Sequence, residues 1–205
     1  MGSQRPLLVI ACGALARELL AVIGASGWPH IHVQCLPADL HNRPERITGA
    51  VREKIRAARA RFERVFVAYG DCGTGGALDR MLAEEGVERI AGAHCYEFLA
   101  GSAAFERLSE REPGTFYLTD FLLRHFDRIV IRGLGIDRYP HLAAQYFGNY
   151  RRLVYLAQQP SEEKTAAARA AAERLGLQFE AHPTGLAPLT RALGFAKREA
   201  VQWAG

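Results

Sequence analysis

Short apolar runs rich in Val, Ile and Phe alternate along the chain with longer segments in which apolar residues recur at helical spacing. This alternation is typical of a parallel β-sheet covered by helices. Strands are predicted at residues 7–11, 31–36, 64–68, 89–91, 115–118, 153–156 and 178–180. Helices are predicted at residues 14–26, 45–62, 77–86, 98–110, 120–131, 142–150, 161–175 and 186–193. The pattern therefore predicts an α/β fold, doubly wound, with a mainly parallel sheet flanked by helices.

The chain contains no internal repeat and no Pro/Ser-rich linker that would divide it. Its 205 residues are about the size of one large domain. Glycines and a proline combine at residues 132–140, the one stretch where a hinge is expected. We therefore predict a single α/β domain over residues 1–205. A hinge at residues 132–140 would divide this domain into two lobes.

Apolar residues make up 49% of the chain and charged residues 23%, values close to those of folded globular proteins. No apolar run is long enough to cross a bilayer, and the run at residues 7–11 is too short for a secretory signal. The net charge of +4 is dispersed except at residues 52–64, where apolar positions at helical spacing indicate a solvated helix face. We predict a cytoplasmic protein whose partners are neither membranes nor nucleic acids.

Three of the four cysteines directly follow predicted strands. Cys12 follows the first strand, Cys72 the third and Cys95 the fourth. The carboxyl ends of parallel strands meet at one edge of a sheet, and neighbouring strands lie about 4.8 Å apart. Small cysteines also pack well at tight turns, so each thiol alone has a purely structural interpretation. Their matching positions predict a shared site.

Three thiolates from separate turns are suited to binding a soft metal. The chain has no CxxC pair, so an ordinary zinc ribbon or thioredoxin-like motif is not supported. We predict that Cys12, Cys72 and Cys95 bind an iron–sulfur cluster with one open iron, or else a zinc or iron ion completed by histidine or water. Cys35 lies within a predicted strand and is expected in the core.

Three polar residues near these turns are candidates for proton transfer or substrate contact. His41 lies in the turn after the second predicted strand, which opens on the same edge as the cysteines. Asp71 and His94 each adjoin one of the cysteines. Each has a structural alternative, since His41 fits a polar loop and a residue beside a ligand often points away from it.

Glycines at the same turns are candidates for contacts to a cofactor. Gly13, Gly73 and Gly75 let the backbone approach a bound group, and Thr74 lies between the last two. Backbone N–H groups in such turns favour anions such as phosphate. The spacing matches neither a P-loop nor the dinucleotide fingerprint, so this motif alone is weak.

Several of these motifs, taken together, resemble one protein family. They are Ile10-Ala-Cys-Gly-Ala-Leu15, Leu36-Pro-Ala-Asp-Leu-His-Asn-Arg-Pro-Glu45, Tyr69-Gly-Asp-Cys-Gly73, His94-Cys95 and Pro113-Gly-Thr-Phe-Tyr-Leu118. The chain resembles the domain of unknown function 1638 over nearly its whole length. Members of that family are often encoded near corrinoid methyltransferase components, so the resemblance implies one-carbon or methyl-transfer metabolism and a corrinoid protein as a partner. It also supports Cys12, His41, Cys72 and Cys95 as site residues.

Three functions follow from these observations as hypotheses. The first is a metal-binding enzyme or accessory protein that uses the three thiolates to hold the cluster or ion. The second is a metal-free transferase or hydrolase in which one cysteine attacks, with His41 or His94 as base. The third is a module that binds a small molecule or a corrinoid partner without chemistry. The sequence does not name a substrate.

Overall fold

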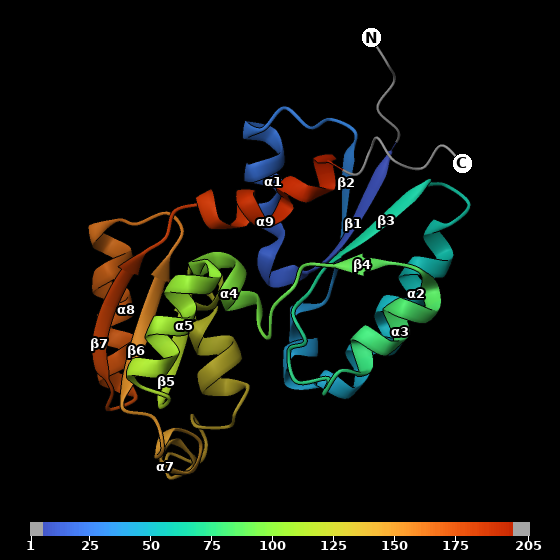
Figure 1. Cartoon of the computed structure of the whole chain (residues 1–205). Helices are drawn as coiled ribbons and strands as arrows, with labels where there is room; N and C mark the ends of the chain where they lie inside the picture. Colours follow the sequence, from blue (N-terminus) through green and yellow to red (C-terminus); the bar gives the residue numbers. More distant parts are fainter. Residues whose placement is uncertain (1–5, 199–205) are drawn as a thin grey trace. The chain divides into compact units, whose positions relative to one another are not determined.

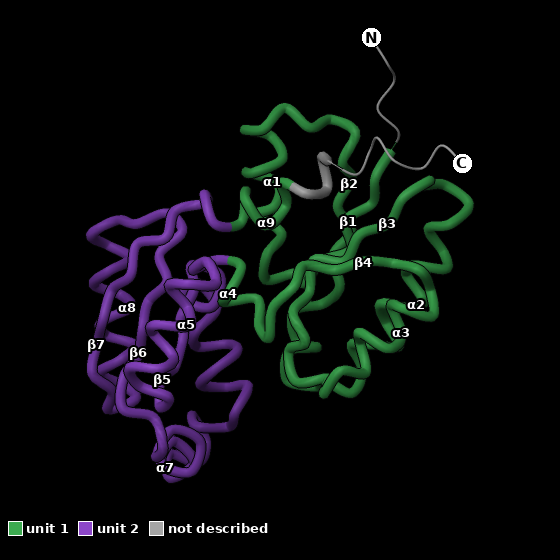
Figure 2. Tube along the Cα trace, viewed as in Figure 1, with its two compact units in different colours: residues 1–98, 189–205 green, residues 99–188 purple. Residues whose placement is uncertain are grey.

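The computed structural model describes residues 6–198, with side chains described up to residue 194. The chain forms two compact units (Figure 2). The second unit is Leu99–Pro188, and the first contains the chain up to Phe98 together with the chain from Leu189 onward. The stretch predicted as a hinge, residues 132–140, lies inside the second unit. The single domain over residues 1–205 stays a prediction.

A parallel sheet with the strand order β2-β1-β3-β4 forms the centre of the first unit (Figure 1). Its strands are β1 (Leu7–Cys12), β2 (Ile31–Leu36), β3 (Arg64–Ala68) and β4 (Glu88–Arg89). β1 is buried at every position, as expected for a central strand covered on both faces. It pairs with β2 on one side and with β3 on the other. The strand order therefore reverses between β1 and β3.

Helices connect these strands, as parallel pairing requires. The connecting helices are α1 (Ala16–Ala25), α2 (Ile47–Ala58) and α3 (Ala77–Glu85), with short 3-10 turns at Gly13–Leu15, Ala38–Asn42 and Pro44–Arg46. Helices α4 (Cys95–Ala100) and α9 (Ala187–Arg198) belong to this unit in part and connect none of its strands. Helix α2 buries Ile47, Val51 and Ile55, which recur every four residues on one side. On its solvent side Arg56 pairs with Glu85 of α3 at 2.8 Å. The basic stretch predicted as a solvated helix face is therefore neutralised in part within the fold.

The structure corrects one prediction about the cysteines of this unit. Cys35 is exposed, so the expectation that it belongs to the core is wrong. It lies on β2, an edge strand of the sheet, in which only the terminal residues Ile31 and Leu36 are buried. β2 contains His32 and Gln34, whereas β1 is apolar throughout, so the sequence carried a signal that β2 is the less buried strand.

The second unit contains a smaller parallel sheet with the order β5-β6-β7 (Figure 1). Its strands are β5 (Thr115–Thr119), β6 (Arg152–Ala157) and β7 (Gln178–Pro183). Its helices are α5 (Ser102–Arg111), α6 (Asp120–Arg124), a π-helical segment (Asp127–Arg132), α7 (Leu142–Phe147) and α8 (Glu162–Arg174). Helix α8 begins with Ser161, whose side chain accepts a hydrogen bond from Lys164 N at 3.2 Å. Its alanines Ala168, Ala171 and Ala172 are buried, which lets the helix pack closely in the core.

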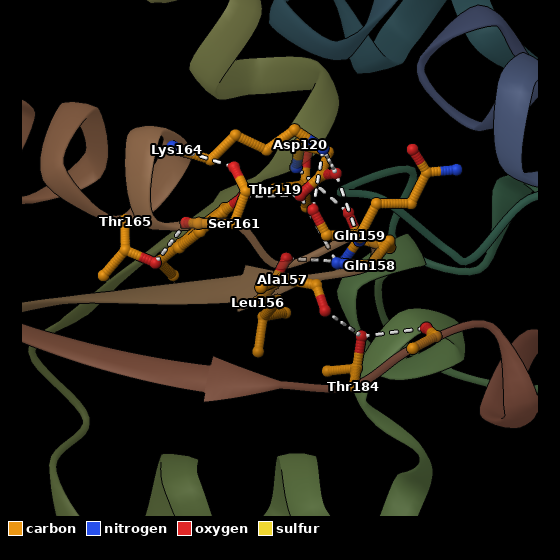
Figure 3. A network of polar contacts seen from close by, with 12 residues as sticks. Thr119, Asp120, Leu156, Ala157, Gln158, Gln159, Ser161, Lys164, Thr165 and Thr184 are labelled. Carbon is orange, nitrogen blue, oxygen red and sulfur yellow. Dashed lines mark hydrogen bonds and ion pairs between the residues drawn. The ribbon is translucent and has the colours of Figure 1, made fainter.

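A buried carboxylate ties together the carboxyl ends of β5 and β6 (Figure 3). Asp120 Oδ1 accepts a hydrogen bond from the Tyr155 hydroxyl at 2.6 Å, and Asp120 Oδ2 accepts one from Lys164 Nζ at 2.7 Å. The backbone N–H groups of Gln158 and Gln159 donate to the same carboxylate. The two strands and helix α8 are thus joined at one polar point within the second unit.

The pairings between the described strands are all parallel, and helices flank both sheets. This confirms the predicted α/β fold class. These strands form two separate sheets, the first from β1 to β4 and the second from β5 to β7. In the part of the chain that the structure describes, no helix is both long and apolar enough to cross a membrane.

Candidate functional site

The two central strands of the first sheet end where the strand order reverses. β1 ends at Cys12 and β3 ends at Ala68, and Ala11 is the register partner of Ala68. In open parallel sheets such a reversal leaves a crevice outside the carboxyl ends of the strands, where ligands bind. The loop after β3, residues 69–76, therefore begins where the fold favours a binding site.

Asp71 holds this loop in shape. Its Oδ1 accepts hydrogen bonds from Thr74 Oγ1 at 2.6 Å and from Gly76 N at 2.9 Å, and its Oδ2 accepts one from Gly75 N at 3.1 Å. The Thr74 hydroxyl contributes most to lowering the pKa of Asp71. Both carboxylate oxygens are thus engaged within the loop, and the catalytic role of Asp71 stays a prediction.

Several backbone N–H groups of the glycine-rich turns donate hydrogen bonds within their own loop. The N–H of Thr74 donates to the Asp71 carbonyl oxygen at 3.0 Å, and that of Gly75 donates to the Asp71 side chain. A β-carbon on Gly13 would lie 2.9 Å from a backbone oxygen of β2, so glycine is needed there for packing. Gly73 has a φ of +85°, which glycine adopts without strain. The contact to a cofactor predicted for Gly13, Gly73, Thr74 and Gly75 stays a prediction.

Two loops are clamped together beside β3. Asp71 N donates to the Gly92 carbonyl oxygen at 3.1 Å, and Cys72 N donates to the Ala93 carbonyl oxygen at 2.8 Å. Cys72 has a φ of +48°, and among the described residues it is the only one other than glycine with a positive φ. A non-glycine residue in this region is strained, and such strain persists only where the surroundings fix it. The clamp fixes the Cys72 backbone in this way.

Glycine at position 70 is required by the same clamp, and Gly70→Ala tests it. A β-carbon there would lie 2.9 Å from the backbone of His94, closer than side chains approach backbone in folded proteins. We expect Gly70→Ala to lower the free energy of unfolding by about 1–3 kcal/mol, because one loop must move away from the other. Urea denaturation measures this change.

The matched control for this prediction is Gly49→Ala in helix α2. Nothing lies within 4 Å of a β-carbon at that position. Alanine favours a helix over glycine by about 0.5–1 kcal/mol, so this variant should be more stable than the wild type. An equal loss of stability in both variants would show that the approach of the two loops does not matter.

The three predicted thiols of the site lie in one buried group. Cys12, Cys72 and Cys95 are 5%, 7% and 6% exposed. Cys72 interacts with the Cys95 thiol, and Cys12 is close enough to both for its charge to affect their titration. The structure thus brings together the thiols of three strand ends.

The three thiols are electrostatically unequal. The pKa of Cys72 is lowered, above all by the Cys95 thiol, then by the His94 imidazole and the Cys95 backbone, against the effect of burial. Its partner Cys95 has a raised pKa, because of the interaction with Cys72 and because of burial. Burial also raises the pKa of Cys12 to about 11. Negative charge in the group therefore collects on Cys72.

Two histidines accompany Cys72. The side chain of His94 interacts with the Cys72 sulfur, and this raises the pKa of His94. His41 is exposed on the turn after β2, and its charge adds to the lowering of the Cys72 pKa. The ring of Tyr96 lies 6.2 Å from that of His41 and 6.5 Å from that of His94. The ring of Tyr96 thus lies near both histidines that act on Cys72.

Tyr69 belongs to the site, although the sequence analysis did not single it out. It is 2% exposed, and its hydroxyl has no hydrogen-bond partner among the described residues. The hydroxyl is near enough to the Cys12 thiol to offset part of the effect of burial there, although it lies outside hydrogen-bond geometry. A signal was available, because Tyr69 is the first residue after a buried strand, at the edge where the cysteines are expected.

The thiol group has no ready-made arrangement for a metal ion. Among the His, Cys, Asp and Glu side chains that the structure describes, no three or more form a group that could hold one. The iron–sulfur cluster, the zinc or iron ion and the role of Cys12, Cys72 and Cys95 as ligands stay predictions.

Fold and site together define an α/β protein with a thiol group at the carboxyl ends of parallel strands. The family model described as protein of unknown function (DUF1638) matches residues 35–193. The chain belongs to this family, which confirms the resemblance seen in its motifs. The family description names no corrinoid protein, so the association with corrinoid methyltransferases stays a prediction. No curated protein and no solved structure matches the chain.

Proposed function

We propose that the protein is an enzyme in which the Cys72 thiolate is the nucleophile and His94 its proton donor and acceptor. The pairing of these two side chains across the clamped loops is the observation that carries this proposal. A cysteine beside a histidine is a common way in which proteins activate a thiol for covalent catalysis. The strained backbone of Cys72 supports the proposal, because such strain clusters at functional sites.

The reaction that suits this pair is the transfer of a group from a small molecule. The thiolate sulfur attacks an electrophilic carbon and forms a sulfur–carbon bond. The leaving group departs with the electron pair of the broken bond and takes a proton from His94. A second nucleophile then accepts the group and frees the thiolate. Acyl and alkyl donors fit this scheme, and methyl transfer linked to a corrinoid protein is one case of it.

A second candidate function is the binding of a soft metal by Cys12, Cys72 and Cys95. It is favoured by the convergence of three thiols from three strand ends, which a single nucleophile does not require. Thiolates select iron–sulfur clusters and zinc over hard cations. A single ion would require the side chains to rearrange, since the described groups do not already hold one.

One experiment on anaerobically purified protein separates the two candidates. Part of the sample is analysed for iron, sulfide and zinc, and part is treated with iodoacetamide and mapped by peptide mass spectrometry. We expect Cys72 to be modified first, and Cys72→Ser to remove the fast reaction. Cys35→Ser, on an exposed thiol outside the group, is the matched control and should leave it unchanged.

One result of the metal analysis would favour the metal site over the cysteine nucleophile. Iron and sulfide at near-stoichiometric levels in the wild type, lost in each of the serine variants of Cys12, Cys72 and Cys95, would support the cluster. Protein without metal whose three buried thiols react equally slowly would contradict both candidates.

A further inference from the structure

We infer that Cys72 and Cys95 form a dithiol pair that exchanges with disulfides of small molecules and becomes a Cys72–Cys95 disulfide, which two small thiols reduce again by the reverse exchange. This inference goes beyond the proposed group transfer and rests on one part of it, the Cys72 nucleophile, to which it assigns a second class of substrate. The chemistry requires two thiols within reach of each other and one that attacks first.

The clamp between the two loops places this pair. Cys72 N is bonded to the Ala93 carbonyl oxygen at 2.8 Å, and Cys95 lies two residues further along that loop. One residue earlier in each loop, Asp71 N donates a hydrogen bond to the Gly92 carbonyl oxygen at 3.1 Å. Two backbone hydrogen bonds therefore hold the loops side by side at the level of the thiols, and the two side chains interact.

Cys12 is the rival for the role of second thiol. It lies at the end of β1, where the backbone is paired with Leu36 of β2. The loops of Cys72 and Cys95 follow neighbouring strands, β3 and β4, and are bonded directly to each other. Cys95 is therefore the thiol that a backbone link keeps beside Cys72.

The exchange proceeds in two steps, in which atoms and electrons balance. The Cys72 thiolate attacks one sulfur of the disulfide, and the other sulfur leaves as a thiolate with the electron pair of the broken bond and takes a proton. Cys95 then loses its proton and attacks the Cys72 sulfur of the mixed disulfide, which releases the second small thiol. The disulfide is reduced to two thiols, and the protein loses two hydrogen atoms.

The test uses the reduced full-length protein and bis(2-hydroxyethyl) disulfide, a small neutral probe suited to buried thiols. After acid quenching, mass spectrometry of the intact protein and its peptides locates every adduct and disulfide. In the wild type we expect a Cys72–Cys95 disulfide, no lasting adduct on Cys72 and the release of two equivalents of mercaptoethanol for each such disulfide formed. Cys95→Ser should retain one mercaptoethanol on Cys72, at least tenfold longer than the wild type retains it.

Cys35→Ser is the matched control, because it removes an exposed thiol outside the group and should behave like the wild type at Cys72 and Cys95. Cys12→Ser tests the rival second thiol, since it would trap the adduct on Cys72 if Cys12 were the thiol that resolves it. Cys95→Ala serves as a second variant, and circular dichroism shows whether each variant is folded. A lasting adduct on Cys72 in the wild type would overturn the inference. So would trapping by Cys12→Ser but not by Cys95→Ser or Cys95→Ala. In either case, fast reaction of Cys72 with iodoacetamide would leave the proposed nucleophile standing, whereas its absence would remove both.

Discussion

Cys72 is expected to react with iodoacetamide at nearly the same rate at pH 6 as at pH 8. The reaction requires the thiolate, and an ordinary thiol gains about 100-fold in thiolate across these two units. Interactions with Cys95 and His94 lower the pKa of Cys72 well below that of an ordinary thiol, so we expect its thiolate to be formed already at pH 6. We expect its rate to change by less than about threefold over this range. Peptide mapping of timed, quenched samples gives the rate at each cysteine.

The variant His94→Ala tests the cause of this flat profile. Removal of the imidazole takes away one of the groups that stabilise the Cys72 thiolate, so the pKa rises and the rate at pH 6 should fall. Exposed Cys35 provides the internal reference, because its pKa is raised and its rate should increase steadily with pH. A Cys72 rate that climbs as steeply as that of Cys35 in the wild type would show that the thiolate is not favoured at this site.

Asp120→Ala is expected to lower the free energy of unfolding by about 2–4 kcal/mol, because it removes a buried carboxylate and leaves several hydrogen-bond donors without their acceptor. The Asp120 side chain is 3% exposed, and its loss leaves the Lys164 ammonium without its counter-ion. It also leaves the Tyr155 hydroxyl without its acceptor. Urea denaturation gives the change in free energy, and hydrogen exchange of the β6 amides shows whether it is located in the second unit.

Tyr155→Phe is the matched control for this variant. It removes one neutral donor to the carboxylate and keeps the ring in the core, so the expected loss is about 0.5–1.5 kcal/mol. Losses of similar size in the two variants would mean that the ion pair contributes no more than a single hydrogen bond.

Much of the fold was accessible from the sequence, because buried parallel strands are short apolar runs separated by helices. The run at residues 31–36 coincides with β2, and the helix predicted at residues 161–175 contains α8. Pairing was not accessible, since the apolar run of β5 does not record which strand lies beside it. For this reason the sequence pattern predicts one sheet where the structure has two, and it predicts a core position for Cys35, which is exposed.

The site was accessible in outline and not in its chemistry. Cys12, Cys72 and Cys95 follow strands, and the carboxyl ends of parallel strands lie at one edge, so their convergence could be predicted. The distinct character of Cys72 depends on its backbone angle and on the loop facing it. Neither the backbone angle nor the facing loop can be inferred from the spacing of residues in the sequence. Tyr69 was missed because an aromatic residue after a buried strand is usually part of the core, as it also is here.

The first unit is interrupted in the sequence, since it closes with Leu189 and the residues after it. Protein synthesis proceeds from the amino terminus, and compact units fold as their residues emerge from the ribosome. The second unit is continuous, so it can complete its core while the first still lacks α9. Leu189 and Leu193 are buried in the finished fold and are among the last described core residues to be made. The thiol group therefore emerges early on the ribosome, but the unit that carries it is completed only after the whole second unit has been made.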